Sequence, residues 1–198
     1  MTRNSRKRSE RKAAEKMKTV IVFLADGFEE CEGLLVVDLL RRARVNVITA
    51  SIMGKKEITS SHGIVLFADE LAEDVDFAAA DMVVLPGGGI GTKNLAESDI
   101  VLEQCREFAA SKLLGAICAA PSILAGLGLL EGKPATCYPT FADRMHGAVL
   151  TGEQVAVAGN IITGQGLGAA VPFALELIRH LKDNETADTV ARKICWRG

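Results

Sequence analysis

The stretch Gly115–Pro121 reads Gly-Ala-Ile-Cys-Ala-Ala-Pro and decides the fold. A short apolar run, residues 113–117, ends at Cys118, and small residues, a proline and a helix-like segment over 122–127 follow. Strand, sharp turn and helix in this order outline a nucleophile elbow, in which the turn pushes its apical side chain out of the sheet. A helix amino terminus at that point favours a thiolate. The alternative is a buried structural cysteine at a strand end, because free cysteine is among the most buried residue types.

Two further buried-strand runs end in comparable turns. Residues 81–85 open into Pro86–Gly91, where three consecutive glycines let backbone N–H groups approach a ligand oxygen closely. Residues 20–25 lead into a turn and an acidic helix start at 26–32. In an open parallel sheet, ligands bind where the carboxyl ends of the strands meet the loops. We therefore expect the acidic start, the glycine loop and Cys118 to lie on one rim.

Strands and helices alternate along the whole chain. Strands are expected at residues 19–25, 45–50, 62–67, 81–85 and 113–117, and in a hairpin over 155–163 that turns at Gly159-Asn160. Helices are expected at residues 32–43, 98–110, 122–127, 169–181 and 185–194. This alternation predicts one domain with a parallel sheet that is covered by helices on both faces.

The three stretches together resemble the ThiJ/PfpI family of the class I glutamine amidotransferase-like superfamily. The matching motifs are Ala25-x-Gly27-x-Glu29-Glu30-x-Glu32, residues 83–88 and residues 116–121, within a resemblance that covers about residues 18–182. The resemblance implies an α/β fold, a flavodoxin-like three-layer sandwich with a central, mostly parallel sheet and a nucleophile-elbow cysteine. It also implies a homodimer, and a reactive Cys118 that is hydrogen-bonded to a protonated Glu32.

Glu29, Glu30 and Glu32 could each be a first-turn carboxylate that interacts favourably with the helix dipole. The alignment with the family motif is what singles out Glu32. A carboxyl group buried near a thiolate has a raised pKa, so it can stay protonated and donate to sulfur. We expect Gly87, Gly88 and Ala119 to bind the substrate or an oxyanion through their backbone N–H groups. For the glycines, a plain tight loop is the alternative.

The histidines do not supply an obvious catalytic base. His146 follows a loop and is the histidine that could reach the site, whereas His62 and His180 are expected to be structural or capping residues. Tyr138 stands where many family members have a histidine, and Ala119 stands where the protease-like branch has one. Both departures argue against a peptidase and a cysteine-histidine triad. Tyr138 and His146 remain possible pocket residues.

No cofactor or metal is expected from the sequence. Gly164–Gly168 resembles a dinucleotide fingerprint, but no βαβ unit follows it, so NAD binding is rejected. The cysteines, histidines and acidic residues show no metal-ligand spacing.

Composition narrows the class of protein. The chain has 198 residues, 48% of them hydrophobic, which is enough for one domain with a sizeable core. The net charge of -2 gives the bulk of the protein no strong attraction to nucleic acid. The 5 cysteines have no paired spacing and predict free thiols in a reducing cytoplasm. Apolar runs are too short to cross a membrane.

The amino terminus differs in composition from the rest. Residues 1–18 contain eight lysines and arginines, two glutamates and almost no apolar side chains. We expect residues 1–17 to be a basic, disordered extension and residues 18–198 to be a single ThiJ/PfpI-like domain. A tail that binds nucleic acid is one interpretation of the extension. A non-functional extension upstream of Met17 is the favoured one.

These observations predict a cofactor-independent glyoxalase or protein deglycase that acts through Cys118 on methylglyoxal or its adducts. The alternative is a non-enzymatic stress-response protein, redox-sensing or chaperone-like, that uses oxidation of Cys118. The partners expected are a small reactive carbonyl compound and a second copy of the chain. Leu34, Val37 and Leu40 make the first helix apolar on more than one face, which suits a homodimer.

Overall fold

A computed structural model describes residues 17–198. The expectations made for the basic amino-terminal extension, including nucleic-acid binding, concern residues outside this range. Among residues 17–198, no helix is both long and apolar enough to span a membrane.

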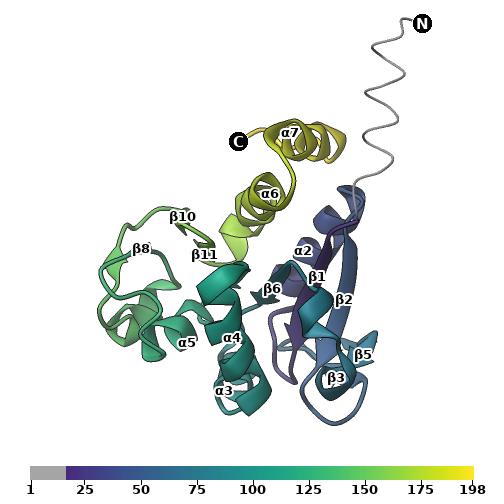
Figure 1. Ribbon diagram of the computed structural model, residues 1–198, viewed down its shortest axis with the longest axis vertical. Helices are drawn as coiled ribbons and strands as arrows, with labels where there is room; N and C mark the ends of the chain where they lie inside the picture. The colour runs from purple at the N-terminus through teal and green to yellow at the C-terminus, as the bar shows by residue number, and fades with distance from the viewer. Residues whose placement is uncertain (1–16) are drawn as a thin grey trace, which may run out of the picture.

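A seven-stranded sheet forms the centre of the fold (Figure 1), with the strand order β10-β11-β7-β6-β1-β2-β5. Every neighbouring pair is parallel except the hairpin of β10 and β11. The strands are β1 (Thr19–Leu24), β2 (Asn46–Ser51), β5 (Glu70–Leu71), β6 (Met82–Leu85), β7 (Leu113–Ile117), β10 (Val155–Ala158) and β11 (Ile161–Gly164). The expected mostly parallel sheet is confirmed.

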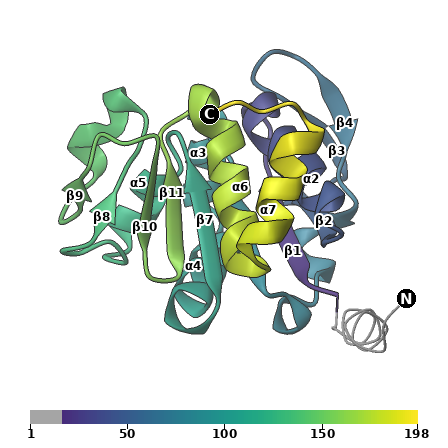
Figure 2. The same cartoon turned by 90° about the horizontal axis from the view of Figure 1, so that it is seen from above.

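Helices cover both faces of this sheet. Figure 2 shows α6 and α7 over one face, beside α2, while α3, α4 and α5 lie behind the sheet. The first layer contains α2 (Glu30–Arg42), α6 (Ala170–Leu181) and α7 (Asn184–Lys193). The second contains α3 (Gly89–Ala96), α4 (Asp99–Ser111) and α5 (Pro121–Gly126). The three-layer sandwich is thus confirmed.

Strand β1 shows why the central strands are apolar throughout. Val20, Val22 and Leu24 pack into the core beneath α2, α6 and α7. The alternate residues Ile21 and Phe23 pack into the core on the other face. Because successive side chains point to opposite faces and both faces are covered, every position from Val20 to Leu24 is apolar.

Smaller elements lie at the edges of the sheet. Strands β3 (Glu57–Thr59) and β4 (Val65–Phe67) form an antiparallel hairpin, and β8 (Pro134–Ala135) pairs with β9 (Val149–Leu150). Four short 3-10 turns, η1 (Ala72–Asp74), η2 (Phe77–Ala79), η3 (Pro139–Arg144) and η4 (Leu167–Ala169), complete the described elements.

The β3–β4 hairpin is tied to the loop between β1 and α2. The Gly27 N–H donates to the Thr59 carbonyl at 2.7 Å, and the Ser61 N–H donates to the Phe28 carbonyl at 2.8 Å. The Asp26 side chain accepts the Thr59 N–H at 2.8 Å. These bonds fix the hairpin against the start of α2.

Several local expectations from the sequence were wrong. The strand expected over 62–67 is shorter, since residues 61–63 form the turn of the hairpin. The expected loop over Pro86–Gly91 ends early, because α3 begins at Gly89. Of the three apolar residues expected to favour a dimer, only Leu34 is exposed, at 39%, whereas Val37 and Leu40 lie in the core.

Candidate active site

Cys118 occupies the turn between β7 and α5, with a backbone φ of 66°. Residues other than glycine rarely adopt this left-handed conformation, because their Cβ crowds the backbone. The turn is held by two bonds to neighbouring segments. The Cys118 N–H donates to the Gly164 carbonyl at 2.9 Å, and the Cys118 carbonyl accepts the Tyr138 N–H at 2.7 Å. The strand–turn–helix outline expected around Cys118 is therefore present.

Glu32 reaches the same point from the first turn of α2. Its N–H donates to the side chain of Glu29, which caps the helix at 2.6 Å. Its side chain is buried, with 1% of the residue exposed, and Oε2 accepts the Gly87 N–H at 3.0 Å. The Glu32 carboxyl also hydrogen-bonds to the Cys118 side chain. The structure thus brings Glu32, Gly87 and Cys118 together.

Gly87 lets these two side chains meet. A Cβ built on Gly87 would overlap Glu32 Oε2 and lie 2.5 Å from the Cys118 Cβ and 3.0 Å from Sγ. Gly88 is equally restricted, because its φ is 91° and a Cβ there would lie 2.6 Å from the Glu29 nitrogen. Gly87 and Gly88 are therefore required by close packing, whereas a Cβ on Gly89 would meet nothing within 4 Å.

The electrostatics of Cys118 combine opposing contributions. Burial and the negative charge of Glu32 raise the pKa of the Cys118 thiol to about 12, while hydrogen bonds from the backbone at Gly88 and Ala119 lower it. The expected stabilisation of the thiolate by N–H groups is present. It is outweighed by burial and by the neighbouring Glu32.

Glu32 has the complementary shift. Burial raises the pKa of its carboxyl to about 7, against the lowering effect of its hydrogen bonds to Cys118 and Gly87. Near neutral pH the Glu32–Cys118 pair therefore changes between a form that carries two protons and a form that carries one. In the singly protonated pair, one proton is shared between carboxylate and thiolate, so the two groups titrate as a unit.

Tyr138 and Glu32 both approach Gly166. A Cβ built on Gly166 would lie 3.2 Å from the Tyr138 ring and 4.0 Å from Glu32 Oε1. Beside it is a cavity of about 320 Å³ that carries no lysine, arginine, aspartate or glutamate; it is lined by Tyr138, Pro139, Gln154, Gln165, Gly166, Leu167, Gly168 and Ala169. Neither Glu32 nor Cys118 lines this cavity, and Gly166 is the lining residue that comes near Glu32.

The histidines lie elsewhere. His146 is exposed in the loop after η3, and among residues 17–198 no hydrogen bond links it to Cys118 or Glu32. His180 contacts the Glu176 carbonyl one helical turn earlier at 3.1 Å, as a capping residue would. The structure therefore gives His146 no contact with the pair.

Sequence reasoning missed a second cluster at the start of α2. The Glu30 carboxylate contacts His62 Nδ1 at 2.7 Å and accepts the Ser61 hydroxyl at 3.0 Å. Ligand atoms of Glu29, Glu30 and His62 lie within 4.8 Å of one another, so the group could hold a metal ion. No spacing signal exists for it, because the hairpin supplies His62 from 32 residues away. Glu29 and Glu30 are already engaged in hydrogen bonds, and we assign no metal here.

Comparison with known proteins identifies relatives of this arrangement. The DJ-1 homolog B of Arabidopsis thaliana is 34% identical over 168 residues, which make up 84% of this chain and 38% of that relative. The chain thus spans less than half of the length of that relative. The Caenorhabditis elegans glutathione-independent glyoxalase DJR-1.2 is 28% identical over 186 residues, covering 92% of this chain and 98% of the relative.

A solved structure shows the same fold. The oxidized DJ-1 of Toxoplasma gondii superposes with a TM-score of 0.88 at 32% identity, over 91% of this chain and 100% of that one. The sequence profile of the DJ-1/PfpI family matches residues 18–180. The profile match covers most of the chain, and the sandwich observed above is the fold of that solved relative. This protein therefore belongs to the DJ-1/PfpI family.

Proposed function

We propose that this protein is a cofactor-independent glyoxalase or deglycase that converts methylglyoxal or its adducts through Cys118 and Glu32. The observation that carries the proposal is the buried Glu32–Cys118 pair beside backbone N–H donors. A perturbed acid next to a thiol in such surroundings is typical of a catalytic site. The relative named as a glutathione-independent glyoxalase supports the reaction class.

The first step uses the shared proton. As the Cys118 sulfur attacks the aldehyde carbon of methylglyoxal, the thiol proton passes to Glu32 and the carbonyl electrons move onto oxygen. The N–H groups of Gly88 and Ala119, which hydrogen-bond to Cys118, stabilise the negative charge of the attacking sulfur and of the new oxyanion. Protonation of that oxygen by Glu32 gives a thiohemiacetal and returns the carboxylate.

The second step moves a proton between carbons. Glu32 takes the proton from the former aldehyde carbon, and the electrons of that bond move toward the ketone oxygen, which gives an enediolate. The hydroxyl proton of the thiohemiacetal moves to that oxygen, and Glu32 returns its own proton to the neighbouring carbon, which gives a lactoyl thioester on Cys118. Water cleaves the thioester, and lactate and the free thiol are released. The sum is methylglyoxal plus water giving lactate. With an amine or thiol adduct of methylglyoxal as substrate, the amine or thiol is released as well.

A second function is favoured by the same donors. Oxidation of Cys118 to a sulfinate would place oxygen atoms where the N–H groups of Gly88 and Ala119 and a protonated Glu32 can donate to them. This supports the redox-sensing alternative, in which Cys118 is consumed stoichiometrically by peroxide instead of turning over a carbonyl compound.

We further propose that the protein acts as a homodimer. Leu34 on α2 and Ile64, Val65 and Phe67 on the adjoining hairpin are exposed, Phe67 at 71%. Exposed apolar side chains gathered on neighbouring elements mark an interaction surface. Light scattering should give about twice 21.0 kDa for the wild type and a shift toward 21.0 kDa for Phe67→Asp. A wild-type mass of one chain at micromolar concentration would contradict the dimer.

The test of the main proposal is a lactate assay on the purified chain without added cofactor. Cys118→Ser should lower turnover of methylglyoxal by at least about 10²-fold, since a serine hydroxyl is not ionised by this carboxyl. Cys31→Ser, which changes an exposed cysteine next to Glu32 in the sequence, is the matched control and should keep wild-type turnover. Equal turnover in Cys118→Ser would refute the mechanism. No lactate from the wild type, with stoichiometric sulfinate after peroxide, would favour the alternative.

A further inference from the structure

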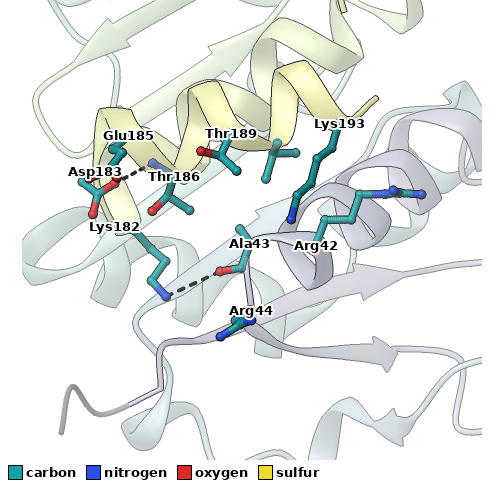
Figure 3. A pocket seen from close by; sticks show the side chains of 10 residues that line it. Arg42, Ala43, Arg44, Lys182, Asp183, Glu185, Thr186, Thr189 and Lys193 are labelled. Carbon is teal, nitrogen blue, oxygen red and sulfur yellow. Dashed lines mark hydrogen bonds between the residues drawn. The ribbon is translucent and has the colours of Figure 1, made fainter. Parts of the chain in front are cut away.

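A second cavity lies between the carboxyl end of α2 and helix α7 (Figure 3), near the amino end of β2, whereas Cys118 follows the carboxyl end of β7. Its volume is about 320 Å³. Four of its lining residues are cationic, two are acidic and two carry hydroxyl groups; they are Arg42, Arg44, Lys182, Lys193, Asp183, Glu185, Thr186 and Thr189. The groove between these helices is thus lined by more cationic and hydroxyl groups than carboxylates, where two packed helices would ordinarily place apolar side chains.

Arg44 holds an unusual backbone conformation in this cavity. Its φ is 59°, and it follows the cap residue of α2. The Arg44 N–H donates to the Arg41 carbonyl at 3.0 Å, and the Val45 N–H donates to the Leu40 carbonyl at 3.1 Å. This bond pair defines a Schellman motif, whose left-handed position normally holds glycine. An arginine there is strained, so helix termination does not explain its presence.

The cationic groups of the cavity are only partly neutralised. Arg42 pairs with Asp38 at 2.8 Å, and the Lys182 ammonium donates to the Ala43 carbonyl at 3.5 Å. Among residues 17–198, Arg44 and Lys193 form no ion pair. Figure 3 shows Lys182 and Lys193 reaching from opposite ends of α7 toward the end of α2.

The hydroxyl groups add donors between these charges. Thr186 and Thr189 lie one helical turn apart on α7 and both line the cavity. The Thr189 oxygen accepts from Arg192 at 2.9 Å, which leaves its own hydrogen available for a ligand. Guanidinium, ammonium and hydroxyl donors around one cavity match the oxygens of a multiply charged oxyanion.

We propose that this cavity binds the phosphate or diphosphate group of a soluble small molecule, with Arg44 and Lys193 as its principal contacts. The site is separate from Cys118 and does not depend on the activity proposed there. In this site the guanidinium of Arg44 contacts the phosphate oxygens, which a glycine at the same position could not do. If Arg44 had a structural role alone, Arg44→Gly would lower the thermal midpoint and leave phosphate binding unchanged.

The test measures inorganic pyrophosphate binding to the full chain by calorimetry, at an ionic strength held constant with sodium chloride. Arg44→Gly should raise the thermal midpoint of the unliganded protein, because glycine relieves the left-handed backbone. The same variant should weaken pyrophosphate binding by about tenfold or more, since a charged hydrogen-bond partner is lost. Lys193→Gln should weaken binding as well.

The matched control is Cys195→Gly. Cys195 has the same φ of 59° and the same motif, with its N–H donating to Arg192 and that of Trp196 donating to Ala191, but it does not line this cavity. Its substitution should also raise the thermal midpoint and leave pyrophosphate affinity within about twofold. Binding that persists in both Arg44→Gly and Lys193→Gln would overturn the proposal. A heat signal for pyrophosphate no larger than that for chloride would also overturn it. The same holds if an oligonucleotide binds in an Arg44-dependent way while pyrophosphate does not bind.

Discussion

Glu30 and Glu32 lie two residues apart in the first turn of α2, and both are buried, yet they face different regions of the molecule. Glu30 faces the β3–β4 hairpin, where its hydrogen bonds, including those to Ser60, Ser61 and His62, outweigh burial and lower its pKa to about 2. Glu32 faces the glycine run and Cys118, and burial raises its pKa to about 7. Glu32 is the more deeply buried of the two, so depth and hydrogen-bond partners together set the charge of each carboxyl group.

The partners that each region provides add to the effect of depth. The hairpin offers hydroxyl and imidazole groups that favour a carboxylate, so Glu30 stays charged and ties two elements together. The sheet edge offers one N–H and a thiol, which cannot replace the water that burial removes. One turn of helix thus supplies a structural anion and a proton-transfer group.

The largest effect should come from exchanging each carboxyl for an amide. Glu32→Gln keeps the shape and the donor near sulfur but removes the proton acceptor, so methylglyoxal turnover should fall by about 10²–10⁴-fold. Glu30→Gln is the isosteric control and should keep turnover within a few fold, because Glu30 does not contact Cys118. Lactate formation measures both. Comparable losses of turnover in the two variants would contradict the different roles assigned to Glu30 and Glu32.

A smaller effect is expected on stability, with opposite pH windows for the two residues. The Glu32 pKa rises from 4.5 to about 7 on folding, so the unfolded chain loses this proton first and stability falls as pH increases through that interval. The full loss is about 3 kcal/mol, at ~1.4 kcal/mol per pKa unit. Glu32→Gln should abolish it.

Glu30 changes the folding stability with pH in the opposite direction, and over a lower pH range. Its pKa falls from 4.5 to about 2, so its contribution is present above 4.5 and is lost as pH drops toward 2. Urea unfolding at pH 3, 5 and 8 tests both residues. Glu30→Gln should reduce only the loss between pH 5 and 3. A Glu32→Gln protein that keeps the wild-type decrease between pH 5 and 8 would contradict the assignment.

The smallest expected effect is the pH dependence of Cys118 alkylation. Below pH 7 the pair gains its second proton, so iodoacetamide labelling of Cys118 should slow by up to about tenfold per pH unit. Peptide mass spectrometry separates Cys118 from Cys105, whose pKa burial raises to about 12 without a carboxyl partner. In Glu32→Gln the inflection near pH 7 should disappear. An unchanged inflection would assign it to another group.

The sequence predicted the architecture better than the chemistry of the site. Alternating apolar strands and helices specified the parallel sheet, because each strand is buried on both faces. Helix α3 was missed, since Gly89 and Gly91 at its start have low helix propensity. Glu32 was distinguished from Glu30 by family register alone. The contacts that separate their pKa values come from the hairpin and from Gly87, which local sequence cannot reveal.

The contact between Glu32 and Gly87 also bears on folding kinetics. The two residues are 55 positions apart in the chain, and their hydrogen bond requires β1 and β6 to be paired. Contacts of such long range form late, after the entropy of loop closure has been overcome. Until then, Cys118 has neither its burial nor its carboxyl neighbour and reacts as an ordinary thiol. A pulse of alkylating reagent during refolding would therefore record when the central sheet is complete.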